Sequence, residues 1–309
     1  MLTENKVAFV FPGQGAQRVG MGYDLYQTYP SAKRIFERAD SVLGFPMSQL
    51  CFEGPEDQLR RTINAQPAIM TVSLACLAAV RETGIETRLG PPLFVAGHSL
   101  GEYTALAASG VVSFRRALNL VRERGKLMEE AAQLKPGGML AVLGLDDKAM
   151  RQVCKLSGVQ IANINCPGQV VVSGDEEALS GAQAVAQEKG GKVRPLDVSG
   201  AFHSTLMRRA MRRLIRILAA LRFRRPRIPI VANTSAKALR SSNEVRAELG
   251  QQLCHCVHWQ KSVEYMADNG VGTFVEMGPG QTLASLIRRI KPEVEALSLR
   301  DVPSIEEMR

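Results

Sequence analysis

The sequence contains few aromatic residues and few histidines. Phe, Trp and Tyr make up 5% of its 309 residues, and only four histidines occur. Proteins that bind RNA usually stack bases on aromatic side chains, and the chain also has no groove-reading motif. We therefore expect no nucleic-acid partner. The small number of histidines also leaves few candidates for a general base.

The sequence also lacks the signals of a membrane or secreted protein. No apolar run approaches the roughly 20 residues that are needed to cross a bilayer. The N-terminus, Met1 to Lys6, lacks the charged and then apolar order of a signal peptide. We expect a cytoplasmic protein without a membrane partner. The length and a hydrophobic content of 45% predict a large domain, alone or with a smaller one.

Cysteines are too few and too scattered for the disulfide framework of a small secreted protein. We expect all six to be reduced. One segment, Cys254-His255-Cys256-Val257-His258, groups two cysteines with two histidines. Adjacent ligands rarely complete a tetrahedral site alone, and no Cys-x-x-Cys pair occurs elsewhere in the chain. We therefore expect no metal site.

Positive charge is concentrated in one segment. The formal net charge is +9, and the segment from Arg208 to Arg227 contains nine arginines and no acidic residue. Apolar residues recur at helical spacing between Met207 and Leu221, which predicts an amphipathic helix. A solvated basic face is the simplest interpretation. An acidic protein or a phosphate-bearing ligand is the functional alternative.

Alternating strand and helix patterns are typical of an α/β fold with a mainly parallel sheet. The apolar run 7–11 predicts a buried strand that ends in a glycine-rich loop at 12–17. A second strand is predicted at 93–96. Further helices are expected at about 23–43, 68–82, 113–132, 259–269 and, as the last one, 282–290, with further strands at 228–232 and 273–277.

The pattern changes to short elements between residues 137 and 199. They occur in the order β-α-β-β-α-β, which is the order of the ferredoxin-like motif. Gly137-Gly138 and Ser199-Gly200 bound this segment. We expect residues 137–199 to form a small domain inserted into a large one made of 1–136 and 200–309, with a cleft between the two.

Ser99 is the candidate nucleophile. Gly97-His98-Ser99-Leu100-Gly101 follows an apolar run and begins a helix-forming stretch. A serine hydroxyl is a weak nucleophile unless a base takes its proton and the chain presents it clear of the sheet. The two glycines permit a sharp turn, and the Leu100 N–H at the helix N-terminus can stabilise an oxyanion. The pattern predicts a nucleophile elbow in a hydrolase-like core.

His203 is the candidate general base. His98 is adjacent to Ser99, where its side chain should point away from the hydroxyl, and His255 and His258 belong to the cysteine-containing segment. His203 follows a predicted strand at the junction of the two expected domains, where a cleft residue would lie. No acidic residue stands out as a third member. A backbone carbonyl is therefore a candidate for that role.

Seven motifs resemble those of the malonyl-CoA:acyl carrier protein transacylase family, in the family's order and over nearly the whole chain. They are Phe11-Pro12-Gly13-Gln14-Gly15-Ala16-Gln17, Asn64-Ala65-Gln66-Pro67-Ala68, Gly97-His98-Ser99-Leu100-Gly101-Glu102-Tyr103, Arg124-Gly125-x-x-Met128, Asn163-x-Asn165-Cys166-Pro167-Gly168-Gln169, Gly200-Ala201-Phe202-His203-Ser204 and Glu276-Met277-Gly278-Pro279-Gly280. The resemblance implies that Ser99 takes a malonyl group from malonyl-CoA, with His203 as base. The malonyl ester then passes the group to the phosphopantetheine thiol of acyl carrier protein. Malonyl-CoA and acyl carrier protein are the two substrates of a ping-pong reaction, and no cofactor is implied.

The resemblance also implies roles for other residues. The backbone N–H groups of Gln14 and Leu100 would form the oxyanion hole. Arg124 would bind the malonate carboxylate, for which a guanidinium is a bidentate partner. Without the resemblance, Arg124 would be interpreted as a charge on the surface of a helix. Phe202 would disfavour a 2-methyl branch on the substrate.

Three further polar positions match the family's active site: Gln66, Asn163 and Gln252. A backbone carbonyl near Gln252 is expected to orient His203, which would explain why no acid stands out. The chain departs from the family at one place. Where Asn-Pro-Val or Ser-Pro-Val is common, it has His255-Cys256-Val257 and thus lacks the proline.

Several functions stay open at this stage. We expect a monomeric malonyl transferase of fatty acid synthesis, whose basic segment 208–227 attracts the acidic carrier protein. A trans-acting acyltransferase of a polyketide synthase is hardly distinguishable from it. A serine hydrolase or thioesterase would release the acyl group without a carrier, although ordinary α/β-hydrolases have their histidine near the C-terminus. A non-enzymatic interaction module would form no covalent adduct.

Overall fold

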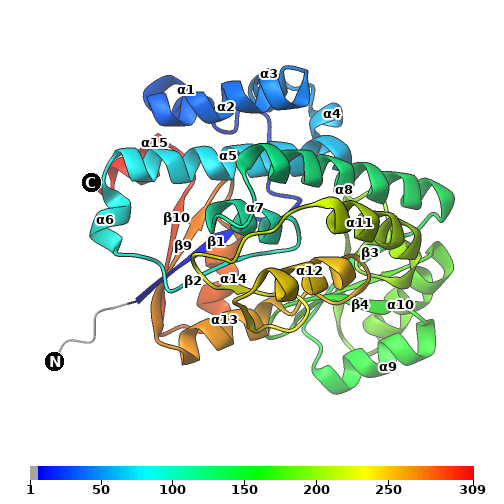
Figure 1. Ribbon diagram of the computed structural model, residues 1–309. Coiled ribbons are helices and arrows are strands. Elements are labelled where there is room, and N and C mark those ends of the chain that lie inside the picture. Colours follow the sequence, from blue (N-terminus) through cyan, green and yellow to red (C-terminus); the bar gives the residue numbers. More distant parts are fainter. Residues whose placement is uncertain (1–5) are drawn as a thin grey trace.

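Two β-sheets organise the chain (Figure 1). The computed structural model describes residues 6–309, and its larger sheet, sheet A, has six strands in the order β10-β9-β1-β2-β7-β8. The smaller sheet B has four strands in the order β4-β5-β3-β6. In Figure 1 the long helix α5 (Thr62–Glu82) lies mainly over sheet A, and α8 (Phe114–Leu134) extends from there over sheet B. The predicted mixed α/β architecture is therefore confirmed.

Sheet A is mainly parallel, as predicted. Its strands are β1 (Lys6–Phe11), β2 (Phe94–Gly97), β7 (Ile230–Val231), β8 (Ala238–Leu239), β9 (Val271–Met277) and β10 (Glu295–Leu299). Only the pair β7 and β8 is antiparallel in the described part of this sheet. Phe11 pairs with Gly97, and Ala96 pairs with Val231. The segments that follow β1, β2 and β7 therefore leave sheet A on one side, at the carboxyl ends of its parallel strands. Parallel α/β sheets form their ligand sites at these ends.

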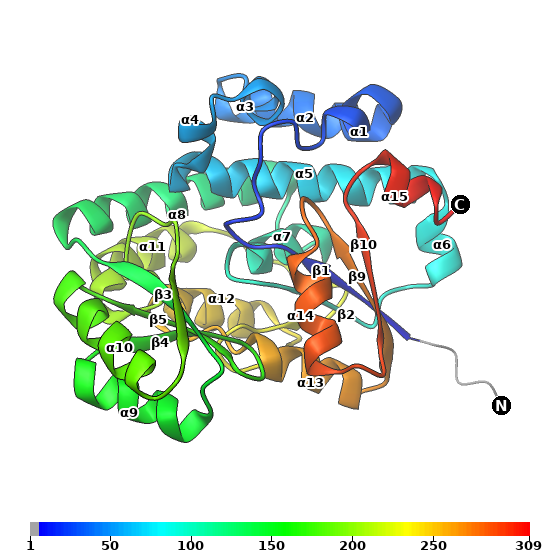
Figure 2. The same cartoon turned by 180° about the vertical axis from the view of Figure 1, so that it is seen from behind.

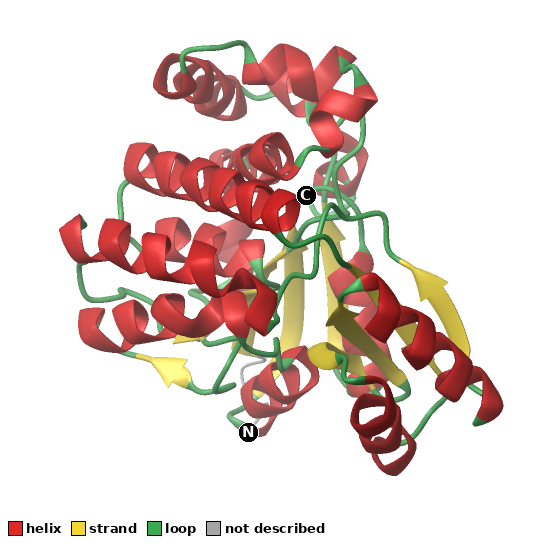
Figure 3. Cartoon of the chain, turned by 90° about the vertical axis from the view of Figure 1, so that its right-hand side faces the viewer, coloured by secondary structure: helices red, strands yellow, loops and turns green. Residues whose placement is uncertain are grey.

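Helices cover both faces of sheet A, as Figures 2 and 3 show. Those of the main core are α2 (Pro30–Leu43), α5, α7 (Leu100–Ala108) and α8, and those of the second core are α13 (Trp259–Asp268) and α14 (Thr282–Ile290). Val7, Phe9 and Phe11 of β1 are buried in the main core. Ala8 and Val10 are buried in the second core. Successive side chains of a strand point to opposite faces, so the apolar run of β1 serves both cores.

Helix α5 corrects one expectation. By length and composition it could cross a membrane, contrary to our prediction that no apolar run approaches the required length. In its most apolar window, however, 83% of the residues are buried inside the protein. A helix that is apolar all round lies either in a membrane or in the core of a large protein. The burial of α5 is typical of a core helix.

Sheet B is antiparallel. Its strands are β3 (Gly138–Leu143), β4 (Gln160–Cys166), β5 (Gln169–Gly174) and β6 (Lys192–Pro195), and its helices are α9 (Asp147–Ser157) and α10 (Glu176–Glu188). Leu140 and Val142 of β3 pack with these two helices. Met139 and Ala141, on the opposite face, belong to the main core. Sheet B is therefore attached to the larger part of the molecule through one of its faces.

Some helix and strand predictions were wrong. The helix expected at 23–43 is two helices, α1 (Tyr23–Thr28) and α2, because Tyr29 is extended before Pro30 and a residue before proline avoids the helical conformation. The helix at 282–290 is not the last element, since β10 and α15 (Val302–Glu306) follow it. The sequence analysis also missed β8, α3 (Met47–Glu53), α4 (Glu56–Arg60) and α6 (Ile85–Leu89).

The basic helix was predicted correctly. Helix α11 extends from Arg208 to Ala220, and Ala210, Leu214 and Leu218 are its buried residues. Helix α12 (Ser242–Gln251) follows it along the chain and packs beside it. The apolar residues of α11 thus face the core, and its arginines lie on the outer side.

Candidate active site

Ser99 lies in a strained turn between β2 and α7. Strand β2 ends at Gly97, α7 begins at Leu100, and Ser99 has a φ of 50°. Positive φ is uncommon for a residue with a side chain and costs of order 1–3 kcal/mol. A Cβ at Gly97 would lie 2.0 Å from the carbonyl carbon of Gly101, and a Cβ at Gly101 would lie 2.0 Å from the Phe11 oxygen. Only glycine fits at these two positions.

Asn233 holds this turn in place. It follows β7, which lies beside β2, and its side chain is fully buried. Its Oδ1 accepts a hydrogen bond from the Ser99 N–H at 2.7 Å, and its Nδ2 donates to the Gly97 carbonyl at 2.7 Å. Asn233 was not among the site residues predicted from the sequence. The available signal was its position just after a predicted strand of a parallel sheet.

His203 contacts the hydroxyl group of Ser99. Its Nε2 lies 2.8 Å from Ser99 Oγ. Its Nδ1 lies 2.9 Å from the carbonyl oxygen of Gln252 and 3.2 Å from that of His255. Carbonyl oxygens only accept hydrogen bonds, so Nδ1 carries the proton and Nε2 is left as an acceptor for the hydroxyl proton. The structure thus places the Gln252 carbonyl where the sequence analysis expected it.

Burial keeps His203 neutral. Removal from water, and next the charge of nearby Arg124, lower the pKa of His203 from 6.5 to about 3. The hydrogen bond to the Gln252 carbonyl opposes this shift. At neutral pH the imidazole is therefore unprotonated at Nε2. An unprotonated nitrogen next to a serine hydroxyl is the arrangement of a general base.

Arg124 is a buried cation beside Ser99. It is 1% exposed, and its Nη2 donates to Ser99 Oγ at 3.0 Å and to the Gln252 side-chain oxygen at 3.1 Å. Its Nη1 donates to the Gln66 side-chain oxygen at 2.8 Å, and its guanidinium stacks on the Tyr103 ring at 4.9 Å.

The hydrogen-bond partners of this guanidinium are all neutral. Within residues 6–309, no carboxylate forms an ion pair with Arg124, and its Nε is buried without a partner. A buried charge without a counter-ion is costly, and burial lowers the pKa of Arg124 accordingly. A small carboxylate that reaches Ser99 would supply the missing negative charge.

Gln252 connects the residues around Ser99. Its side-chain nitrogen donates to the Ser99 carbonyl at 2.8 Å and to Glu102, while its side-chain oxygen accepts from Arg124. Glu102 is fully buried and also accepts from the Asn233 N–H at 3.1 Å. Burial raises the pKa of Glu102 well above its ordinary value, and the neighbouring Glu248 adds to the shift. The sequence analysis did not single out Glu102 as a site residue.

The glycine-rich loop after β1 lies against the Ser99 turn. A Cβ at Gly13 would lie 2.6 Å from the His98 carbonyl oxygen, so the close approach requires glycine. Gln14 follows directly, and its side chain donates to Thr62 at 3.0 Å. Leu100 is the first residue of α7, so its N–H has no acceptor within the helix. Gln14 and Leu100 thus lie on the two segments that meet at Ser99.

The remaining predicted residues lie farther from the hydroxyl or contact it indirectly. Gln66 is fully buried and reaches the site through Arg124. Phe202 is 5% exposed and packs in the main core. Asn163 lies on β4 beside Val257, and its Oδ1 is buried without a partner. The structure gives Asn163 no hydrogen bond to Ser99, His203 or Arg124 within residues 6–309.

His98 points away from the Ser99 hydroxyl, as expected. Its Nε2 lies 2.9 Å from Asn165 Oδ1, and its ring packs near Trp259. The six cysteines form no disulfide within residues 6–309, and their reduced state stays a prediction. The part of the chain that the structure describes contains no group of three or more His, Cys, Asp or Glu side chains that could hold a metal ion.

A basic groove lies next to His203. It has a volume of about 790 Å³ and extends between the end of α8 and the start of α11. Its lining begins at Thr205, two residues after His203, and includes Lys135, Arg208, Arg209, Arg212 and Arg216. Arginines of the basic segment 208–227 thus line a groove whose wall at Thr205 lies two residues along the chain from His203.

Comparison with known proteins gives consistent results. The family described as acyl transferase domain matches residues 8–304. The malonyl CoA-acyl carrier protein transacylase of Bacillus subtilis is 42% identical over 98% of this chain and 96% of its own length. The structure of the acyl carrier protein S-malonyltransferase from Vibrio cholerae covers 98% of this chain and 100% of its own, with 38% identity and a TM-score of 0.94.

A third similarity involves a complex, described as a type II PKS acyl-carrier protein with its malonyl-transacylase. The matched chain covers 98% of this chain and 98% of its own, with 37% identity and a TM-score of 0.94. These solved structures support the mixed α/β fold, with its mainly parallel sheet, over nearly the whole length.

Proposed function

Because the chain belongs to the acyl transferase domain family, with malonyl CoA-acyl carrier protein transacylases as near-full-length relatives, we propose that it transfers a malonyl group from malonyl-CoA to acyl carrier protein. One observation supports this most directly. Ser99 Oγ lies 2.8 Å from the neutral base His203 and 3.0 Å from the buried cation Arg124. A nucleophile between a base and an unpaired cation suits an acyl donor with a free carboxylate.

In the first half-reaction, Ser99 Oγ attacks the thioester carbonyl of malonyl-CoA while His203 Nε2 takes the hydroxyl proton. The tetrahedral intermediate collapses, the carbon–sulfur bond breaks, and the coenzyme A thiol leaves with the proton from His203. The carbonyls of Gln252 and His255 hold the imidazole through Nδ1 during both proton transfers. The product is malonyl-Ser99.

In the second half-reaction, the phosphopantetheine thiol of the carrier gives its proton to His203 and attacks the ester. The carbon–oxygen bond breaks, and Ser99 Oγ recovers the proton. Ser99, His203 and the two thiols account for all bonds and protons, so we propose that no metal or cofactor takes part.

Arg124 selects malonyl over acetyl groups in this proposal. Its guanidinium can bind the malonyl carboxylate in bidentate fashion, while Gln66 and Gln252 fix its orientation. An acetyl group has no carboxylate and would leave the buried guanidinium without a counter-ion. Phe202, adjacent to His203, is proposed to disfavour a 2-methyl branch by its bulk.

The oxyanion is proposed to bind the backbone N–H groups of Gln14 and Leu100. Gly13 supports this, because its contact with His98 brings the loop to the Ser99 turn. Helix α7 adds the positive end of its dipole at Leu100. The buried Oδ1 of Asn163, which has no partner, is proposed to accept a hydrogen bond from an amide N–H of the pantetheine arm.

The architecture supports two finer proposals. The turn at Ser99, with its positive φ and two obligatory glycines, is proposed to be a nucleophile elbow in a hydrolase-like core. Residues 137–199 are proposed to be a ferredoxin-like domain inserted between 1–136 and 200–309. The element order β3-α9-β4-β5-α10-β6 and the sheet order β4-β5-β3-β6 support this assignment.

The basic groove beside His203 is proposed to attract the acidic carrier protein. Charge attraction over such a face raises the association rate and weakens with salt. We expect kcat/KM for the carrier to fall as the ionic strength rises from about 0.05 to 0.5 M, where the Debye length falls from more than about 10 Å to a few ångströms. Transfer to free pantetheine, a small acceptor of little charge, serves as the control. Equal salt dependence with both acceptors would contradict docking on this groove.

Mass spectrometry of the protein mixed with malonyl-CoA tests the central proposal. We expect a malonyl increment on the peptide that contains Ser99 and none in Ser99→Ala. Release of malonate without a carrier, at a rate above that of transfer, would indicate a thioesterase. If no adduct forms, the proposal of a covalent transferase is wrong and a non-enzymatic interaction module is the remaining alternative.

The pathway is a separate question. The similarity to a transacylase in complex with a polyketide carrier keeps a trans-acting role in polyketide synthesis as the second candidate beside fatty acid synthesis. Assays with carriers of both pathways separate the two, because transfer to the polyketide carrier alone would contradict the first. We also propose that the protein is a monomer. We propose a cytoplasmic location, since six free thiols suit a reducing compartment.

A further inference from the structure

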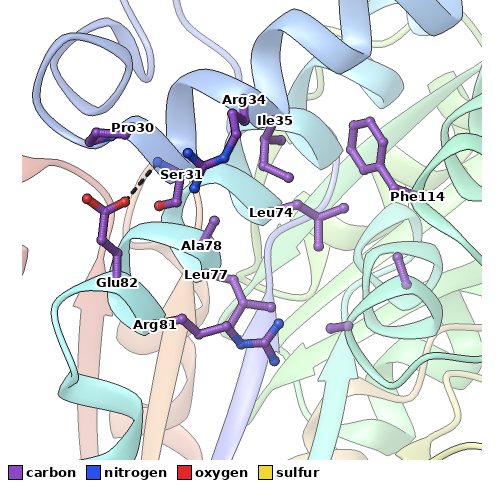
Figure 4. A pocket seen from close by; sticks show the side chains of 12 residues that line it. Pro30, Ser31, Arg34, Ile35, Leu74, Leu77, Ala78, Arg81, Glu82 and Phe114 are labelled. Carbon is purple, nitrogen blue, oxygen red and sulfur yellow. Dashed lines mark hydrogen bonds between the residues drawn. The ribbon is translucent and has the colours of Figure 1, made fainter.

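A second cavity lies at the opposite end of α7 from Ser99. It has a volume of about 730 Å³ and lies between α2, α5 and the junction of α7 with α8 (Figure 4). Small side chains at Ala78, Ala107 and Ala108 leave this space unfilled. None of its lining residues belongs to the site at Ser99. Cavities of this size are typical of small-molecule sites.

The floor of the cavity is apolar. Leu74, Leu77 and Ala78 share one face of α5, because residues three and four apart lie side by side on a helix. Ile35 of α2 and Phe114 of α8 add apolar surface on two sides, and Figure 4 shows Phe114 across the cavity from Ser31. An alkyl chain placed on this floor would remove its own surface and that of the floor from water.

The rim of the cavity offers hydrogen-bond donors that lack acceptors. Ser31 Oγ is buried without a partner, and Arg34 has no hydrogen bond or ion pair within residues 6–309. Of the other charges here, Arg81 pairs with Glu86 at 2.8 Å. The carboxylate of Glu82 forms no ion pair within residues 6–309 and accepts from the Ser31 N–H at 2.8 Å, drawn as a dashed line in Figure 4. A guanidinium has no acceptor atom, so these groups match an anionic acceptor.

We propose that this cavity binds a fatty carboxylate of medium chain length. The alkyl chain lies on the face formed by Leu74, Leu77 and Ala78, and the carboxylate accepts hydrogen bonds from Arg34 and Ser31. A neutral amphiphile would gain nothing from the positive charge of Arg34, which is exposed, and a malonyl group has no alkyl chain to cover the floor. This site is separate from Ser99, so the inference does not depend on malonyl transfer.

Calorimetric titration of the full-length protein with sodium decanoate, below its micelle concentration, tests the proposal. We expect saturable binding of one decanoate per chain. Arg34→Gln removes the free cation and should weaken binding about tenfold, which corresponds to ~1.4 kcal/mol. Ala78→Leu fills part of the cavity floor without changing the charge and should also weaken the binding of decanoate. Arg115→Gln removes the same charge from an exposed position outside the cavity and should have no effect.

All three variants should retain malonyl transfer, which shows that they are folded. The absence of saturable binding to the wild type would overturn the proposal. So would an equal loss of affinity in Arg34→Gln and Arg115→Gln, or decanol binding as tightly as decanoate. Sedimentation that shows a dimer, with decanoate binding only to the dimer, would assign this face to an interface between two copies instead.

Discussion

Substitution of Arg124 by methionine tests the proposed selectivity directly. Methionine keeps much of the side-chain length but removes the charge and the donors to Ser99, Gln66 and Gln252. Removing one partner of a buried, hydrogen-bonded charge pair costs about 3–5 kcal/mol. If the malonyl carboxylate is that partner, kcat/KM for malonyl-CoA should fall roughly 10²- to 4 × 10³-fold, since about 1.4 kcal/mol corresponds to a factor of ten.

Acetyl-CoA should behave differently with this variant. The acetyl group makes no ion pair with Arg124, so its transfer should be unchanged or faster once the unpaired cation is gone. The assay measures kcat/KM for both thioesters with the same carrier protein, and Arg116→Met, at an exposed position on the same helix, serves as the control. A parallel loss with malonyl-CoA and acetyl-CoA would refute the carboxylate pairing. A large fall in the unfolding midpoint would assign the loss to folding.

Three further predictions concern the residues around the hydroxyl. Because the pKa of His203 is lowered to about 3, kcat/KM should show no midpoint near 6.5 between pH 8 and 5. Below pH 6.5 this histidine takes up a proton only in the unfolded protein. It should therefore lower the unfolding free energy by up to about 1.4 kcal/mol for each unit by which the pH falls, and His203→Ala should remove this dependence. The Glu102 carboxylate accepts hydrogen bonds from the Asn233 N–H and the Gln252 side chain. In Glu102→Gln the new amide NH2 group faces one of these two donors, so kcat should fall by at least about tenfold. Gly101→Ala should lower the unfolding midpoint, because its Cβ meets the Phe11 oxygen at 2.0 Å.

Each of these has a clear contrary outcome. A pH profile with a midpoint near 6.5 would mean that the His203 environment is more hydrated than the structure indicates. Wild-type kcat in Glu102→Gln would show that the contact of Glu102 with Gln252 does not position the site. For the glycine, Gly250→Ala is the matched control, since its Cβ would meet Ile215 at an ordinary 3.7 Å. Equal midpoints for the two glycine variants would contradict the close approach.

Local patterns in the sequence were sufficient to predict the turn at Ser99 and most of the helices and strands near it. The turn at Ser99 needs a strand, two glycines and a helix in direct succession, and all of these are adjacent in the chain. Helix α11 was found because its apolar residues repeat with the helical period. The short strand β10 was missed, because only two of its five residues are buried and its pattern is weak.

Long-range contacts were not available from the sequence. Asn233 binds Glu102 and the Ser99 turn across more than a hundred positions of the chain, and its position after a predicted strand does not reveal these partners. Asn163 was predicted for the site from its motif, yet the structure gives it a position on β4 without a hydrogen bond to Ser99.

The sequence by itself predicted Ser99 as the nucleophile and, by elimination among four histidines, His203 as its base. Both depend on residue types and on neighbours along the chain. Only the tertiary structure decided the state of Arg124, which its local sequence presents as a surface charge. Packing of α8 beside Ser99 and Gln252 removes the guanidinium from water and gives it only neutral partners. Burial and pairing are properties of contacts between distant segments. In this protein they give Arg124 a buried charge without an ion pair within residues 6–309, and the carboxylate site that we propose rests on this charge.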